Sequence, residues 1–99
     1  MAEYQVTQWR DLPSLVVARD PDSPDDLVKV MLAGRCQEAI DEAAMRLGEV
    51  DAEAYLNGWT RTPWAPEQGS PADVAARISA ELEAQWDDSA LRAYLDRLH

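Results

Sequence analysis

The sequence predicts one small α+β domain, with a three- to four-stranded antiparallel sheet, a main helix and two C-terminal helices packed on it. Three observations lead to this fold class. The N-terminal third alternates apolar and polar residues, as half-buried strands do. The middle of the chain holds an unbroken helical pattern, and the last third opens with a helix-capping sequence. A length of 99 residues suits one domain.

The first third of the chain predicts a meander of three strands. We expect these strands near residues 3–9, 15–19 and 27–32. A turn at 10–14 and an exposed loop at 20–26 separate them, because both segments carry proline and aspartate. Strands that follow one another through short links favour antiparallel pairing.

The main helix is predicted at residues 33–48. Its apolar positions recur at steps of three or four: Cys36, Ile40, Ala43 and Leu47. This spacing places them on one face. Gly48 is a suitable C-cap, since glycine adopts a left-handed conformation without a Cβ clash. We expect this helix to lie across the sheet.

The region after the main helix is less regular. The pattern at 49–57 is ambiguous, although Asp51 could cap a short helix there. Residues 58–64 are typical of a fourth extended segment, and Pro63 favours an edge position because it cannot donate to a ladder. Residues 65–69 are predicted to form a loop.

Two C-terminal helices are expected at 71–86 and 89–98. Ser70 is a good N-cap, Pro71 suits the first turn, and apolar residues four apart follow. The predicted core of the whole domain is drawn from its strands and helices: Val6, Val17, Val30, Ile40, Leu47, Val74, Ile78 and Leu82.

The charge balance limits the classes of partner. Nineteen acidic and nine basic residues give a formal net charge of −10. This charge disfavours binding to nucleic acid, because such binding requires a basic patch. It is consistent with either a solvated acidic surface or a basic partner. The chain has neither a signal-peptide pattern nor an apolar stretch of membrane-spanning length, so we expect a cytoplasmic protein that does not bind membranes.

No residue pattern predicts catalysis, a metal or a cofactor. Cys36 is the only cysteine and lies on an apolar helix face, where a structural role is favoured over a reactive thiolate. His99, the only histidine, could pair with it only from the last position of the chain. The aspartates of 20–26 lack the glycine and glutamate of a calcium loop.

Tryptophan is the surplus that most suggests a binding role. Four tryptophans occur in 99 residues that contain no phenylalanine. We expect Trp9 and Trp86 to fill the core. Trp59, Arg61 and Trp64 are the candidate residues for binding a partner or ligand, because tryptophan and arginine are enriched in binding hot spots.

Several segments resemble the small bacterial virulence-factor family, a domain also found in conserved virulence factor C proteins. The markers are W-R-D-L-P at 9–13, R-x-Q-E-A-I-D at 35–41 and G-S-P at 69–71. The chain departs from the family pattern at Ala33 and Cys36, where proline and phenylalanine are usual. The resemblance covers about residues 3–87 and implies a family-like domain at 1–87 with a helical extension, 88–99, packed on it.

The family has no agreed activity or cofactor, so the resemblance transfers no functional residue. An association with one-carbon and corrinoid methyl-transfer genes implies an accessory role. We therefore expect a non-catalytic protein-interaction or accessory module, which could serve a larger methyl-transfer enzyme system. The alternatives are a small-ligand-binding protein or enzyme with a site near 59–64, and an acidic inhibitor of a basic partner.

Overall fold

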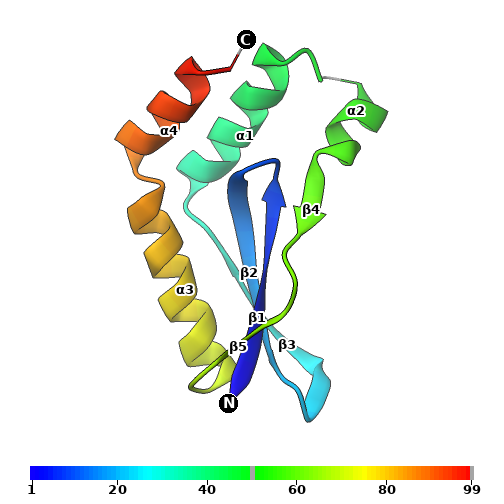
Figure 1. Cartoon of the computed structure of the whole chain (residues 1–99), viewed down its shortest axis with the longest axis vertical. Coiled ribbons are helices and arrows are strands. Elements are labelled where there is room, and N and C mark those ends of the chain that lie inside the picture. The colour runs from blue at the N-terminus through cyan, green and yellow to red at the C-terminus, as the bar shows by residue number, and fades with distance from the viewer. Residues whose placement is uncertain (50, 99) are drawn as a thin grey trace.

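The computed structural model describes residues 1–49 and 51–98 and confirms the α+β class (Figure 1). One five-stranded antiparallel sheet combines with four helices. In chain order the elements are β1 (Ala2–Trp9), β2 (Leu12–Asp20), β3 (Ser23–Met31), α1 (Gly34–Arg46), α2 (Ala52–Asn57), β4 (Trp59–Arg61), β5 (Ala65–Glu67), α3 (Pro71–Gln85) and α4 (Asp88–Asp96).

The sheet is built around β1. Strand β2 pairs with one edge of β1 and β3 pairs with β2, which is the predicted meander. Strands β4 and β5 both pair with the other edge of β1, at its two ends. Between them, Thr62 donates its N–H to the Val6 carbonyl at 3.0 Å and accepts the Val6 N–H on its hydroxyl at 2.9 Å. The predicted fourth segment therefore does join an edge of the sheet, through β4 and the Thr62 bonds to Val6.

Three predicted loops were too long. The turn at 10–14 is confined to two residues, and β2 already begins at Leu12, because an irregularity in the register near Ser14 accommodates Pro13 opposite Gln8. The loop at 20–26 also shrinks to a two-residue turn, in which the Asp20 carboxylate accepts the Asp22 N–H at 2.9 Å.

The loop predicted at 65–69 was wrong for its first half. Ala65–Glu67 forms β5, and its partner is the first half of β1. Proline is tolerated there because β5 is an edge strand. Polar and proline-rich composition therefore concealed strand residues at each of these three places.

The helix with the largest sheet contact is α3, which lies along one side of the strands (Figure 1). Its start matches the prediction, since the Ser70 hydroxyl accepts the Asp73 N–H at 3.2 Å. The helix predicted to lie across the sheet, α1, instead packs on β2 and on α4 at one end of it. The ambiguous segment does contain a helix, α2, capped by the Asp51 carboxylate on the Ala54 N–H.

The core forms two clusters. One lies between α3 and the sheet, and the other joins the upper end of the sheet to α1 and α4. Five of the eight predicted core residues are buried: Val6, Val17, Ile40, Val74 and Ile78. The other three, Val30, Leu47 and Leu82, are only half-buried, because each lies on the margin of a cluster.

Candidate functional site

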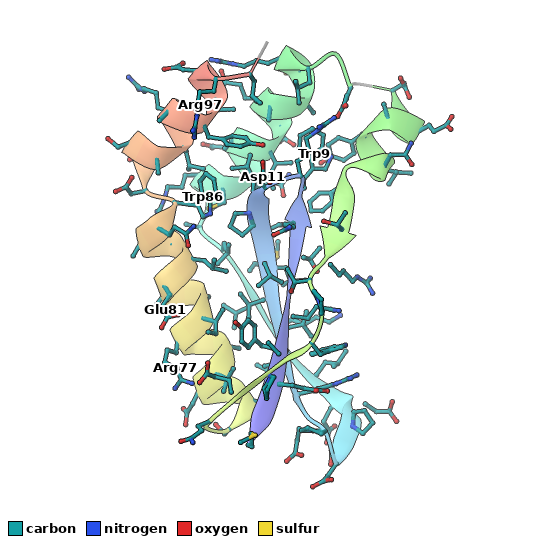
Figure 2. All side chains as sticks on the ribbon, viewed as in Figure 1. Trp9, Asp11, Arg77, Glu81, Trp86 and Arg97 are labelled. Atoms are coloured by element: carbon teal, nitrogen blue, oxygen red, sulfur yellow. The ribbon has the colours of Figure 1, made fainter. Side chains whose placement is uncertain are left out.

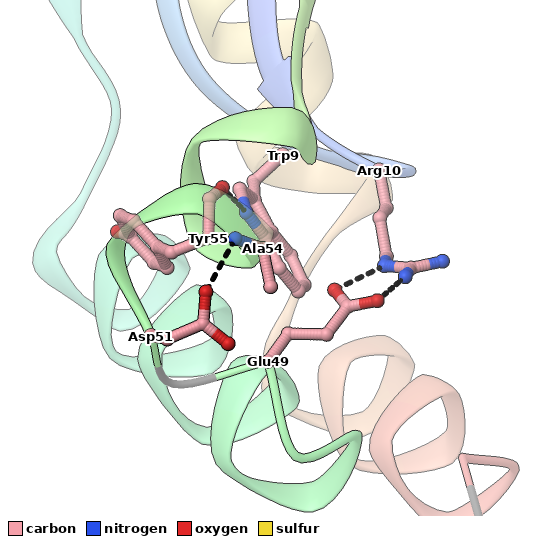
Figure 3. Close-up of polar contacts among 6 residues, drawn as sticks. All are labelled: Trp9, Arg10, Glu49, Asp51, Ala54 and Tyr55. Atoms are coloured by element: carbon pink, nitrogen blue, oxygen red, sulfur yellow. Dashed lines mark hydrogen bonds and ion pairs between the residues drawn. The ribbon is translucent and has the colours of Figure 1, made fainter.

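Trp9, at the end of β1, is an entirely buried residue. Its indole Nε1–H donates to the Tyr55 carbonyl at 2.8 Å, and its ring stacks on Tyr55 with centroids 5.9 Å apart (Figure 3). A Cβ on Gly58 would lie 2.4 Å from the same Nε1, so only glycine allows α2 to approach the indole. Trp9 is therefore a core residue, as predicted.

Arg10 fastens the β1–β2 turn to the linker after α1. Its guanidinium makes a two-pronged ion pair with the Glu49 carboxylate, with Nε to Oε2 at 3.1 Å (Figure 3). Its backbone N–H donates to the Gly58 carbonyl at 2.8 Å. Arg10 also has φ +54°, a left-handed conformation that favours glycine. These contacts compensate for that conformation, so Arg10 acts as a structural clamp.

The three candidate residues occupy two places on the sheet. Trp59 is half-buried, edge-on to Tyr55 with centroids 6.0 Å apart, and lines an open cavity of about 520 Å³ with Thr7, Thr60 and Arg61. Trp64 does not line that cavity. It lies farther along the strands, where the Arg19 guanidinium carbon is 3.8 Å from its ring centroid.

The strand register shows that both places belong to one face of the sheet. Directly opposite residues of antiparallel strands point to the same face. Val16 and Ala18 of β2 pack in the α3 cluster, so their neighbours along the strand point away from α3. The open face is defined by this register, by the cavity that Trp59 and Arg61 line, and by the Arg19–Trp64 contact. It consists of Glu3, Gln5, Thr7, Leu15, Val17, Arg19, Lys29, Met31, Trp59, Arg61 and Trp64.

None of the helices that the structure describes covers the lower part of the open face (Figures 1 and 2). The face nevertheless carries apolar side chains. Met31 is 72 % exposed, Leu15 and Trp64 are half-buried, and Val17 is only 6 % exposed beneath its neighbours. An antiparallel sheet commonly leaves one face in water, but that face is then mainly polar.

The open face is also basic, in contrast to the rest of the chain. It holds three of the nine basic residues, Arg19, Lys29 and Arg61, and one acidic residue, Glu3. Glu3 accepts from Arg19 Nε at 2.6 Å. Within residues 1–49 and 51–98, neither Lys29 nor Arg61 forms an ion pair. Two free positive charges therefore lie on opposite sides of this face.

Sequence reasoning found Trp59, Arg61 and Trp64 but missed the residues that β2 and β3 add to the same face. Alternation along each strand could have grouped Arg19 with Val17, and Lys29 with Met31. The pairing register was needed to place both groups beside Trp64. That register depends on two irregularities in the ladder, near Ser14 and at Arg19, which no local pattern indicates.

The other residues considered for chemistry do not form a reactive or metal-binding site among the described residues. Cys36 is buried, and this burial raises the pKa of its thiol, which disfavours the reactive thiolate. The proposed partner His99 lies outside the described residues. Across the described ranges, no three His, Cys, Asp or Glu side chains lie close enough together to hold a metal ion. No helix in those ranges has both the length and the apolar character to cross a membrane.

A cavity of about 670 Å³ forms a charged groove between α1 and α4. Two of its three arginines, Arg35 and Arg46, are already engaged. Arg46 bonds to the Leu95 carbonyl at 2.8 Å and to Glu42 at 3.0 Å, and Arg35 bonds to the carbonyls of Trp86 and Glu83. These bonds join the helices to one another, so the groove is a structural seam.

The segments that resemble a known family have structural roles of the same kind. W-R-D-L-P supplies Trp9 and the Arg10 clamp, R-x-Q-E-A-I-D supplies the Arg35 bonds, and G-S-P supplies the α3 cap. A family model described as "Virulence factor" matches residues 7–95, which takes in most of α4. No curated protein and no solved structure matched the chain.

Proposed function

We propose that this chain, which belongs to the virulence-factor family, is a non-catalytic module that binds a protein partner through the open face. The observation that carries the proposal is the open face itself, where exposed Met31 and half-buried Leu15 and Trp64 lie among Lys29 and Arg61, which form no ion pair with the described residues. Exposed apolar side chains with aromatic and arginine neighbours are typical of protein interfaces. The family description by itself specifies neither a partner nor an activity.

The edges of the sheet favour docking on the face over pairing along an edge. Strand β3 has Pro24 and a bulge opposite Arg19, and the β4–β5 edge carries Pro63 and Pro66. Proline and bulges protect edge strands against added strands. A partner therefore has better access to the side chains of the open face than to its backbone groups.

Capture from native lysate with matched charge variants tests this proposal. The wild-type protein should retain a stoichiometric partner, and the double variant Lys29→Ala/Arg61→Ala should lose it. The control Arg92→Ala/Arg97→Ala removes the same charge from exposed positions on α4 and at its C-cap, where Figure 2 shows Arg97, and should keep the partner. No stoichiometric partner, or equal loss with both variants, would contradict the proposal.

Small-ligand binding at Trp59 and Arg61 is the second candidate, supported by the cavity of about 520 Å³ that they line. An indole beside a guanidinium suits a planar carboxylate. Small-molecule sites usually enclose most of their ligand, whereas four residues line this open cavity. Titration with benzoate, followed by the amide signals of Thr7 and Thr60, would support this candidate if both signals shift saturably in the wild type and not in Arg61→Ala.

An accessory role beside a larger methyl-transfer enzyme and inhibition of a basic target both remain predictions. The accessory role agrees with docking through the open face, because a small subunit would bind a larger enzyme through such a face. The second would use the acidic residues on the helices and on the β2–β3 turn. The capture experiment separates them, because only the first predicts loss of binding in Lys29→Ala/Arg61→Ala.

A further inference from the structure

We infer that the segment docking on the open face is an amphipathic helix of the partner with acidic residues on both flanks of its apolar stripe. The inference rests on the proposed function and specifies its partner. It follows from the charges on the face, from the shape of the face, and from the way α3 covers the opposite face.

The charges favour carboxylates at two separate places. Lys29 on β3 and Arg61 on β4 lie at opposite sides of the open face, and neither has an ion-pair partner among the described residues. The net charge of −10 opposes an acidic partner at long range, but salt screens charges beyond about 8–10 Å. At contact, Lys29 and Arg61 therefore favour acidic residues on the flanks of the docked segment.

The acidic turn between β2 and β3 limits where such a segment can lie. Asp20, Asp22, Asp25 and Asp26 lie at or beside this turn, next to Arg19, whose guanidinium is already paired with Glu3. Carboxylates of a partner would be repelled there. The acidic flanks are therefore expected away from this turn, beside Lys29 and Arg61, while the apolar stripe lies over Leu15, Met31 and Trp64.

The dimensions of this region match a helix. Strands β2 and β1 lie between Lys29 on β3 and Arg61 on β4, and neighbouring strands lie about 4.8 Å apart, so the two outer strands are about 14 Å apart. A helix with its side chains is about 10–12 Å wide. A helix aligned with the strands would therefore place its apolar stripe on Leu15, Met31 and Trp64 and one flank beside each cation.

The opposite face of the sheet already holds a helix of this type. Helix α3 packs Val74, Ala75 and Ile78 against the strands and carries three acidic residues and one arginine. Figure 2 shows Glu81 and Arg77 on this helix. A second acidic helix on the open face would complete a three-layer arrangement around the same sheet.

The experiment uses three synthetic 16-residue helical peptides and the isotope-labelled full chain. The first peptide has an apolar stripe flanked by glutamates, the second replaces those glutamates with lysines, and the third is a scrambled form of the first without a stripe. The glutamate-flanked peptide should shift amide signals of the open face, and its Kd should rise at least tenfold with Lys29→Glu/Arg61→Glu. The control Arg92→Glu/Arg97→Glu should leave its Kd unchanged.

Several results would overturn the inference. The lysine-flanked or scrambled peptide could bind as well as the first, or the shifts could map to α1 and α4. Signal broadening with protein concentration and no peptide would instead make a second copy of the chain the occupant. The proposed function fails separately: a captured partner that depends on Lys29 and Arg61 but contacts them through a basic or non-helical segment would preserve the function and remove only the acidic helix.

Discussion

Trp9 lies on β1 and Trp64 on the link between β4 and β5 of the same sheet, yet their environments are opposite. Trp9 is enclosed by α2, with a backbone acceptor for its indole and a glycine beneath its ring. Trp64 lies on the open face, where it contacts the guanidinium of Arg19 and stays half-exposed. The difference shows that the tryptophans of one small chain can have different roles. Neighbouring backbone decides which tryptophan stabilises the fold and which remains available for contact.

Replacement of Trp9 should give the largest effect. Trp9→Ala removes a fully buried indole and one of the two donors to the Tyr55 carbonyl, so it should cost about 3–5 kcal/mol of unfolding free energy. Small domains have only about 5–15 kcal/mol in total, so the variant should be close to unfolding. Urea denaturation followed by circular dichroism measures the loss. A cost below that of Trp64→Ala would reverse the comparison.

Gly58→Ala tests the same enclosed region from the side of α2. The new Cβ would lie 2.4 Å from Trp9 Nε1 and must displace either the indole or the helix. Overpacking of this kind costs about 1–3 kcal/mol. Gly34→Ala is the matched control, because a Cβ there meets nothing within 4 Å, and it should stabilise the fold by about 0.4–1 kcal/mol. Equal denaturation midpoints for the two variants would show that Trp9 does not depend on close approach by α2.

Helix starts, the fold class and the N-terminal meander of three strands were predictable from the sequence because they depend on local patterns. Ser70 and Asp51 both cap helices as their residue types indicate. The role of α1 was not predictable, because an apolar face shows that a helix is packed but does not show which element it packs against. The extent of β3 and the existence of β5 were also hidden, because tertiary pairing overrides the loop preference of proline and aspartate.

The candidate site was predictable only in part for a related reason. The aromatic and arginine residues of 59–64 are adjacent in sequence, so composition revealed them. Arg19, Lys29 and Met31 reach the same face only through the register of the sheet. Residue type indicates where binding chemistry is present, whereas the pairing of strands determines which of those residues act together.

Trp64→Ala should have a smaller effect on stability than either change in the enclosed region. An exposed cation–π contact contributes about 0.5–1 kcal/mol, and the ring is only half-buried. The unfolding free energy should therefore fall by about 1 kcal/mol, while capture of the partner should be lost. Urea denaturation and the capture experiment on the same sample measure both quantities. A loss as large as that of Trp9→Ala would place Trp64 in the core and remove it from the interface.

Arg61→Ala should have the smallest effect on the fold and still weaken binding. Arg61 is exposed, lies opposite Thr7 on an edge strand, and forms no ion pair within the described residues, so its removal should change the unfolding free energy by no more than about 0.5 kcal/mol. Arg46→Ala is the contrasting variant. It removes a 2.8 Å bond to the Leu95 carbonyl and ion pairs with Glu42 and Asp96, so it should cost about 1 kcal/mol without affecting the partner. Chemical denaturation and capture on both variants should thus give opposite patterns. If Arg61→Ala destabilised the fold as much as Arg46→Ala, the cations of the open face would be structural, as the arginines between α1 and α4 are.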